Sequence, residues 1–314
     1  MVLLKKCVII YNPNSGKKIK KDFLATFIDM LLDKEYIPEI IFSKYRGHIT
    51  KIVEELDEVD LVISVGGDGT FNESMTGNLK RKKRLLLAHI PVGTTNDIGV
   101  MFGYGKDIVE NLKMLLNGVE KSIDICTINN KPFIYVAGFG KFMNVPYETS
   151  RDLKKKYGHI AYLLEGVKEF SQSTNLYDIT YEVDGETYNG LYSFCTISNA
   201  TRIAGIKGFI KDVKLDDNKF EVLLCNITKK QDIVKSLYYL TMNDITKVPG
   251  FYFHKVSSMK IKFNDEQKKN WCIDGEKLED DSNTFDIRVV NDIKLLIPKK
   301  NIDTLFVIQD KKNE

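Results

Sequence analysis

The sequence predicts an α/β domain built around a parallel sheet, followed by a mostly antiparallel β domain. Up to about residue 124, apolar runs of strand length alternate with amphipathic helix patterns, as in βα units. After that point, short runs rich in aromatic and β-branched residues are separated by turn pairs such as Asn129-Asn130 and Asp184-Gly185. A chain of 314 residues, 43% of them hydrophobic, is long and apolar enough for two domains.

Four strands and three helices of the first domain follow from these patterns. Helical spacing is clearest for Phe23, Phe27 and Leu31, which recur every four residues on one face. Similar apolar stripes predict a second helix around 49–56 and a third around 108–115, and each helix can cover one face of the sheet. The four predicted strands lie near residues 6–11, 38–42, 61–65 and 85–90.

The segment Gly66-Gly67-Asp68-Gly69 follows the third strand and opens a predicted helix. Its glycines allow the backbone to approach a ligand closely, and the first N–H groups of the helix are free to bind an anion. A carboxylate beside bound phosphate requires a cation between the two negative charges, so Asp68 implies a magnesium nucleotide. Taken alone, a glycine cluster after a strand is often a plain tight turn.

Two further polar loops follow predicted strands. Pro91-Val92-Gly93-Thr94-Thr95-Asn96-Asp97 comes after the fourth strand, and Asn12-Pro13-Asn14-Ser15-Gly16-Lys17 comes after the first. Ligands of open α/β sheets bind outside the carboxyl ends of the strands. We therefore expect the three loops to converge on one nucleotide.

In the second half, Asp274-Gly275-Glu276 ends a strand with two carboxylates. An Asp-Gly hairpin turn is the alternative explanation, and Asp184-Gly185-Glu186 shows how readily the same tripeptide arises. A phosphoryl-transfer enzyme needs a carboxylate that accepts the proton of the attacking hydroxyl. Asp274 and Glu276 are the candidates, and the pattern does not choose between them.

A second acidic segment, Lys214-Leu215-Asp216-Asp217-Asn218-Lys219, offers carboxylate and carbonyl oxygens to a hard cation. A polar turn between strands is the alternative, and composition favours it. The four histidines lack zinc spacing, and no Ser/His/Asp arrangement is evident. Nucleophilic catalysis by a protein side chain is therefore not expected.

Composition excludes some classes of protein. A net charge of +3 from 46 basic and 43 acidic residues is too balanced for a nucleic-acid binder, and no apolar run approaches the ~20 residues of a spanning helix. Five scattered cysteines suit buried thiols in a reducing cytoplasm. The lysines of 151–157 suit either solvent or an anionic membrane surface. The apolar stripe predicted for a helix at 158–170 suits a core better than an acyl-chain pocket.

The motifs are together those of a known family. The chain resembles the soluble bacterial diacylglycerol kinases and the wider lipid kinase family that includes sphingosine and ceramide kinases. The resemblance covers nearly the whole chain. The Gly-Gly-Asp-Gly-Thr element alone is shared with NAD kinases and resembles a phosphofructokinase signature, but its pairing with Pro-x-Gly-Thr-x-Asn-Asp favours a lipid kinase. The matching segments are 12–16, 66–73, 91–97 and 274–276.

The resemblance implies a nucleotide-binding domain of the phosphofructokinase or NAD-kinase type, formed by residues 1–124 and about 294–314. It implies a β-sandwich lipid-substrate domain at 125–293, with Leu295-Leu296-Ile297-Pro298 beginning the return to the first domain. The implied cofactors are ATP and Mg²⁺. The implied ATP contacts are Asn12, Pro13, Asn14, Ser15, Gly16, Ser43, Gly66, Gly67, Asp68, Gly69, Thr70, Phe71, Asn72, Glu73 and Thr94.

The resemblance also implies a structural magnesium ion, held by Asp216, Asp217 and the carbonyl groups of Lys214 and Lys219. Asn218 stands where the family usually has glycine, but asparagine tolerates left-handed backbone. The family's catalytic base maps onto the 274–276 element. Two other departures from the family pattern are Lys211 in place of proline and Ile98 in place of phenylalanine.

The expected reaction is transfer of the γ-phosphoryl group of ATP to the primary hydroxyl of a diacylglycerol-like lipid. Asp68 would help to hold Mg²⁺, and Asp274 or Glu276 would take the hydroxyl proton. The alternatives are a kinase that acts on NAD or a long-chain base, and a non-catalytic nucleotide or lipid sensor. Because the lipid comes from a bilayer, we expect transient peripheral contact of a cytoplasmic protein with the inner face of the membrane. The oligomeric state stays open, with a homodimer as one option.

Overall fold

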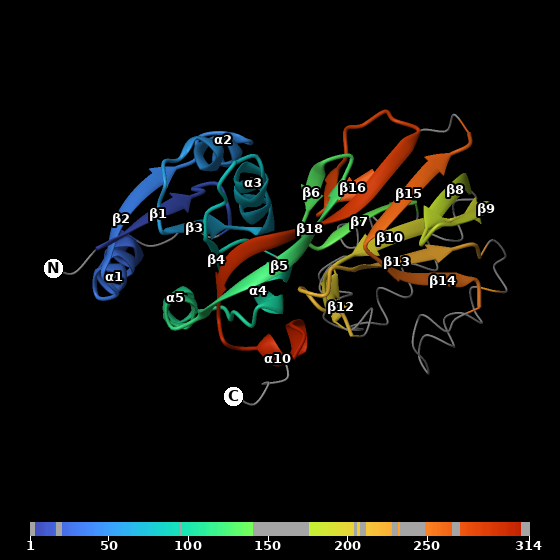
Figure 1. Cartoon of the computed structure of the whole chain (residues 1–314). Coiled ribbons are helices and arrows are strands. Elements are labelled where there is room, and N and C mark those ends of the chain that lie inside the picture. The colour runs from blue at the N-terminus through green and yellow to red at the C-terminus, as the bar shows by residue number, and fades with distance from the viewer. Residues whose placement is uncertain are drawn as a thin grey trace, which may run out of the picture. The chain divides into compact units, whose positions relative to one another are not determined.

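The structure, a computed structural model, describes residues 4–16, 21–94, 96–140, 176–203, 206–207, 212–227, 232, 249–265 and 271–308. The chain divides into two compact units, Met1–Asp124 with Asn291–Glu314, and Ile125–Val290. Each unit is described below by itself (Figure 1). The predicted helix at 158–170 and the lysine-rich segment 151–157 lie outside the described residues.

The first unit is built on a parallel sheet. Its strands β1 (Lys5–Tyr11), β2 (Tyr36–Phe42), β3 (Leu61–Gly66) and β4 (Leu87–Pro91) lie in the order β2-β1-β3-β4. All their pairings are parallel, which confirms the four predicted strands. After the second unit the chain returns through β18 (Thr284–Ile297), whose Leu295 pairs in parallel with Leu87 of β4.

Helices cover both faces of this sheet. Figure 1 shows α2 (His48–Glu55) and α3 (Asp68–Leu79) above the strands, and α1 (Lys21–Leu32) and α5 (Ile108–Leu116) below them. The predicted apolar stripes are the buried ones, with Phe27, Leu31 and Val53 fully inaccessible to solvent. Two shorter helices, α4 (Asp97–Met101) and α10 (Ile302–Leu305), complete the described helices of the unit.

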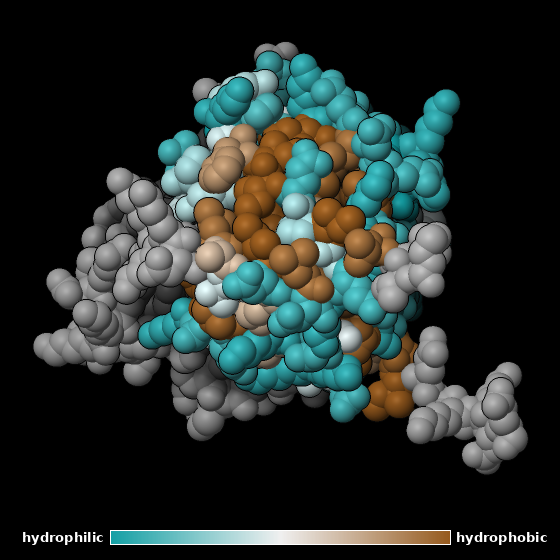
Figure 2. All heavy atoms as spheres, turned by 90° about the vertical axis from the view of Figure 1, so that its left-hand side faces the viewer, coloured by the Kyte–Doolittle hydropathy of each residue, from teal (hydrophilic) through white to brown (hydrophobic). Residues whose placement is uncertain are grey.

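Strand β2 lies at the edge of the parallel sheet. The face that contains it carries an apolar stretch surrounded by polar residues (Figure 2). Ile37 and Phe42 of β2 and Leu32 at the end of α1 are exposed hydrophobic side chains. Pro38 lacks a backbone N–H, and Glu39 is charged and exposed, so both make this edge a poor template for a further strand.

The second unit contains two layers of strands. One layer has β15 (Ser258–Phe263) paired with β8 (Tyr177–Val183) and with the first part of β18, and β8 paired with β9 (Glu186–Tyr192). The short β6 (Lys131–Phe133) pairs with β5 (Val119–Ile128). The other layer has the order β14-β13-β10-β7-β16-β17. Its strands are β7 (Val136–Gly140), β10 (Phe194–Ser198), β13 (Phe220–Cys225), β14 (Phe251–Val256), β16 (Trp271–Ile273) and β17 (Glu276–Lys277).

All described pairings of the second layer are antiparallel. A two-stranded ribbon of β11 (Arg202–Ile203) and β12 (Ile206–Lys207) is separate from both layers.

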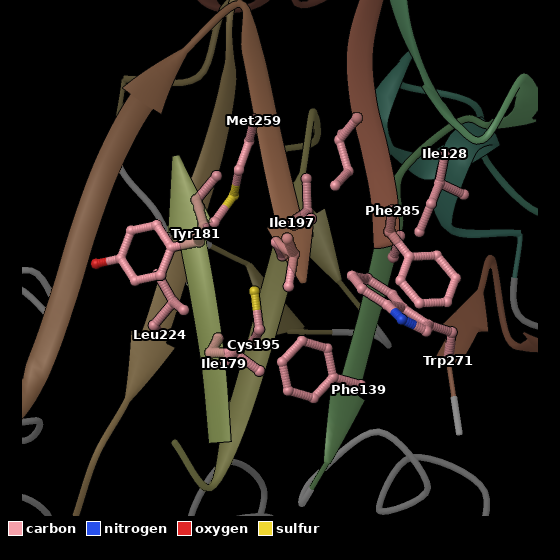
Figure 3. Packing of buried hydrophobic residues seen from close by; sticks show 14 of the residues in the cluster. Ile128, Phe139, Ile179, Tyr181, Cys195, Ile197, Leu224, Met259, Trp271 and Phe285 are labelled. Atoms are coloured by element: carbon pink, nitrogen blue, oxygen red, sulfur yellow. The ribbon is translucent and has the colours of Figure 1, made fainter. Parts of the chain in front are cut away.

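Side chains from both layers form one core (Figure 3). Phe139 of β7 and Trp271 of β16 pack edge to face, at 4.9 Å between ring centroids. Phe285 of β18 lies against the same indole at 5.1 Å. Large aromatic rings packed in this way bury much apolar area and gain favourable edge-to-face contacts. The sandwich and the parallel sheet together confirm the predicted fold class.

The two predicted hairpin turns are present. Asn129 and Asn130 have positive φ between β5 and β6, and Asp184 and Gly185 have positive φ between β8 and β9. Two successive residues with positive φ form the turn whose twist matches antiparallel strands. Four of the five cysteines, Cys7, Cys126, Cys195 and Cys225, are buried. Within the described part of the chain, no helix has the length and apolar character needed to cross a bilayer.

Candidate active site

Three polar loops of the first unit meet at the carboxyl ends of β1, β3 and β4. Because these strands are neighbours in the sheet, the loops that follow them start side by side. Asn12 Nδ2 donates to Thr70 Oγ1 at 3.0 Å, which joins the first loop to the second. The backbone N–H of Val92 donates to the carbonyl of Gly66 at 2.7 Å, which joins the third loop to the second. The three loops therefore lie next to one another at this edge of the sheet, and their binding of one nucleotide stays a prediction.

Glycine is required where these loops approach each other. A Cβ on Gly16 would lie 1.6 Å from the carbonyl oxygen of Val92, and Gly16 also has a φ of +66°. A Cβ on Gly93 would lie 2.6 Å from the Cα of Gly67. Any side chain at these two positions would force the backbones apart. The glycines thus bring backbone N–H groups of different loops into one small region.

Asp68, at the start of α3, forms hydrogen bonds to the end of the loop that follows β4. Its carboxylate accepts the backbone N–H of Asp97 at 3.0 Å and that of Ile98 at 3.3 Å. These donors belong to the first turn of α4, so Asp68 caps that helix from outside.

Glu73 contributes to the fold of the first unit. Its carboxylate accepts the N–H groups of Gly47 at 2.9 Å and Ile49 at 3.2 Å, and so caps α2. Phe71, two residues earlier in α3, is buried. Sequence reasoning placed both residues in contact with ATP, whereas in the structure Phe71 is a core side chain and the Glu73 carboxylate is used within the protein.

The remaining predicted ATP contacts differ in exposure. Ser43, after the neighbouring strand β2, is buried and donates its N–H to Tyr11 at 2.9 Å. Thr94, Gly69 and the tip of the first loop at 13–14 are exposed, and Asn72 is half-buried. The first loop is closed as a turn, since Ser15 Oγ and the N–H of Asn14 both bond to Asn12. Lys17 and Thr95 lie outside the described residues.

A buried histidine beneath the loops was missed by sequence reasoning. His89 of β4 lies with Nδ1 3.0 Å from Ser64 Oγ of β3, and its ring packs on Phe71 of α3 at 5.0 Å. Complete burial lowers the pKa of His89 to about 3, although the hydrogen bond to Ser64 opposes the shift. The imidazole is therefore neutral at physiological pH. Only its place in an apolar strand pointed to such a packing role.

In the second unit, Asp274 anchors a hairpin. Asp274 and Gly275 have φ of 46° and 85° and form the turn between β16 and β17. The Asp274 carboxylate accepts three backbone N–H groups, from Ile134 at 2.7 Å, Tyr135 at 3.0 Å and Val136 at 3.1 Å. The tripeptide is thus a hairpin turn, and the role of either of its carboxylates as a base stays a prediction.

Glu276 differs from Asp274 in its surroundings. It is the first residue of β17, directly after the turn, and it is exposed to solvent. The hairpin at 184–186 has the same three residue types, and Glu186 of that hairpin accepts a hydrogen bond from Tyr188 Oη of its own strand. A tripeptide alone therefore does not define the role of its carboxylates.

In the acidic turn before β13, the Asp217 carboxylate contacts protein groups and does not match its expected role as a metal ligand. Its Oδ1 accepts the N–H of Lys219 at 3.1 Å, and its Oδ2 lies 2.8 Å from Lys255 Nζ. Asn218 has a φ of 58°, which confirms that asparagine adopts the left-handed backbone expected there. No group of three or more His, Cys, Asp or Glu residues in the described segments is arranged to hold a metal ion.

Comparison with known proteins identifies the family. A model of the diacylglycerol kinase catalytic domain matches residues 6–128. The chain is 30% identical over 279 residues to the diacylglycerol kinase of Bacillus subtilis strain 168, covering 87% of this chain and 90% of that protein. The chain belongs to the diacylglycerol kinase family. It is therefore an enzyme, a lipid kinase.

Other relatives of this lipid kinase agree. The diacylglycerol kinase of Staphylococcus carnosus strain TM300 is 28% identical over 276 residues, covering 87% of this chain and 89% of that one. A crystal structure of a diacylglycerol kinase from Bacillus anthracis strain Sterne superposes with a TM-score of 0.73 and 22% identity, covering 95% of this chain and 99% of the other. A putative diacylglycerol kinase from the same strain gives a TM-score of 0.76 at 24% identity, over 95% and 97% of the two chains. These likenesses support the fold.

Proposed function

We propose that this lipid kinase transfers the γ-phosphoryl group of ATP to the primary hydroxyl of diacylglycerol or a similar lipid. The observation that carries the nucleotide part is the convergence of three glycine-containing loops at one edge of the parallel sheet. The acceptor follows from the family, since the matched relatives are diacylglycerol kinases. In this proposal the first unit binds the nucleotide and the second unit receives the lipid.

The loops suit a triphosphate for electrostatic reasons. Backbone N–H groups at the start of α3 and in the loops after β1 and β4 supply fixed partial positive charges, which stabilise phosphate without reorganisation. A magnesium ion bound with the nucleotide neutralises charge on the phosphate oxygens, and Asp68 is the residue that we propose to help hold it. Asn12 and Thr70, hydrogen-bonded to each other, fix the relative positions of two loops.

Glu276 is the better general base of the two candidates. A base must offer an oxygen to the substrate hydroxyl. Asp274 accepts three backbone N–H groups, so we assign it the role of holding the 274–276 turn in place. Glu276 follows the turn and is exposed, so its carboxylate can reach a substrate. The lipid must come from a bilayer, and the proposal therefore includes peripheral contact of a cytoplasmic enzyme with the membrane.

The test incubates the purified protein with ATP, Mg²⁺ and a panel of diacylglycerol, a long-chain base and NAD, and identifies products by mass spectrometry. We expect phosphatidate from diacylglycerol. For Glu276→Gln we expect kcat to fall by roughly 10²–10⁴-fold, because a general base contributes that much. The matched control is Glu186→Gln in the other Asp-Gly-Glu hairpin, which should leave kcat nearly unchanged.

Two results would contradict parts of this proposal. Phosphate found on NAD or the long-chain base in preference to diacylglycerol would change the acceptor but keep the nucleotide site. Equal kcat for wild type and Glu276→Gln, with phosphatidate still formed, would remove the assigned base. Asp274→Asn should instead lower the unfolding temperature, because an amide oxygen cannot replace a carboxylate that accepts three N–H groups.

A further inference from the structure

Lys255 belongs to β14, and its ammonium group lies beside the acidic turn that precedes β13. Its Nζ is 2.8 Å from Asp217 Oδ2, 3.1 Å from the carbonyl oxygen of Asp212 and 3.3 Å from Glu221 Oε1. An ammonium group has three N–H donors, and oxygens of three separate residues lie within 3.3 Å of this one. The Lys255 ammonium group is therefore close enough to the carboxylates of Asp217 and Glu221 to pair with both, although neither Glu221 oxygen makes a hydrogen bond of good geometry.

Position in the sheet explains why these groups meet. Glu221 of β13 and Lys255 of β14 are direct partners in the antiparallel register, so their side chains emerge on the same face. Asp212 and Asp217 belong to the turn that leads into β13. Lys255 thus connects the turn to the neighbouring strand.

Burial makes the cation necessary. Glu221 is 1% exposed, and a carboxylate buried to that extent requires a compensating charge. The side chain of Asp217 is only 17% exposed.

We propose that the Lys255 ammonium is the cation that neutralises Asp217 and Glu221, in place of a divalent ion at Asp217. The acidic turn would then keep its structure without added metal. This departs from the magnesium site that the family resemblance implies for Asp216 and Asp217. It is independent of the proposed catalytic function, since it concerns no residue of the nucleotide loops or of the 274–276 turn.

The experiment measures thermal unfolding of the full, nucleotide-free chain. The wild type should unfold at the same temperature in excess EDTA and in millimolar Mg²⁺. Lys255→Met removes the charge but keeps most of the apolar stem, and should lower the unfolding temperature by roughly 5–10 °C, as for a broken buried ion pair. The matched control, Lys260→Met, changes an exposed lysine of β15 and should unfold like the wild type.

A second variant keeps the proposal testable if Lys255→Met fails to fold. Adding Glu221→Gln to Lys255→Met removes the uncompensated buried charge and should recover part of the lost stability. Equal stability of Lys255→Met and Lys260→Met would overturn the proposal. A wild-type unfolding temperature that falls in EDTA and is restored by Mg²⁺, with no such response in Asp217→Asn, would also overturn it, because Asp217 would then be a metal ligand.

Discussion

Several single side chains of this lipid kinase hold parts of the backbone that lie far apart in sequence. Asp68 holds the first turn of α4, and Asp274 holds residues 134–136. Sequence reasoning singled out both carboxylates because they follow strands and stand beside glycine. It did not predict their backbone partners, because these come from contacts between segments 29 and 140 residues apart. A sequence gives the residue type and its position relative to a predicted strand, whereas the hydrogen-bond partner of a polar group depends on the completed fold.

His89 gives a prediction at this scale. Its folded-state pKa is about 3, below the ordinary value of 6.5, because burial disfavours the charged imidazole. Below pH 6.5 the unfolded chain binds the proton and the folded protein does not, so the stability contributed by neutral His89 is full above that pH and is lost as the pH falls toward 3.

As the pH falls through this range, we expect this single group to lower the free energy of unfolding by at most about 1.4 kcal/mol per pH unit. Urea unfolding of wild type and His89→Gln across this pH range measures the effect. The two stabilities should converge as the pH falls. Parallel curves would show that His89 has the same pKa in the folded and the unfolded chain.

At the scale of elements, the strands and the amphipathic helices of the first unit follow from hydrophobic periodicity. Helix α3 does not, because its buried residues include Thr70, Ser74 and Asn78 beside Phe71 and Met75. It was predicted instead from the glycines and N–H groups at its start. Helix α4 has only five residues, too few for a period, and its start is set by hydrogen bonds to Asp68. Short elements stabilised by side chains distant in sequence are thus the ones that local sequence patterns do not predict.

The contact between α2 and α3 gives a prediction at this scale. Glu73 of α3 caps α2 through the N–H groups of Gly47 and Ile49. Glu73→Ala should lower the free energy of unfolding by about 1–2 kcal/mol, because two N–H groups lose a charged acceptor. Chemical denaturation measures it, with Glu55→Ala as the control, since the exposed Glu55 forms only a long surface pair with Lys51. Equal effects of the two substitutions would show that the cap does not contribute.

At the scale of the whole molecule, the return of the chain to the first unit is the feature that local patterns predict least. It was expected from the family resemblance, and in the structure Leu295 pairs in parallel with Leu87. Local patterns around 291–297 indicate only a strand, because the partner of a parallel strand is fixed by topology. The antiparallel second half was predicted from turn pairs. The order of its strands was not predicted, because a hairpin turn identifies only the pairing of two strands that are adjacent in sequence.

The proposed function requires three separate loops to bind one triphosphate. The most direct measurement is a crystal structure of the protein with Mg²⁺ and a non-hydrolysable ATP analogue. We predict phosphate oxygens within hydrogen-bond distance of backbone N–H groups from the loops after β1, β3 and β4, with the metal ion beside Asp68. An analogue bound away from these loops, or contacting one of them alone, would contradict the account.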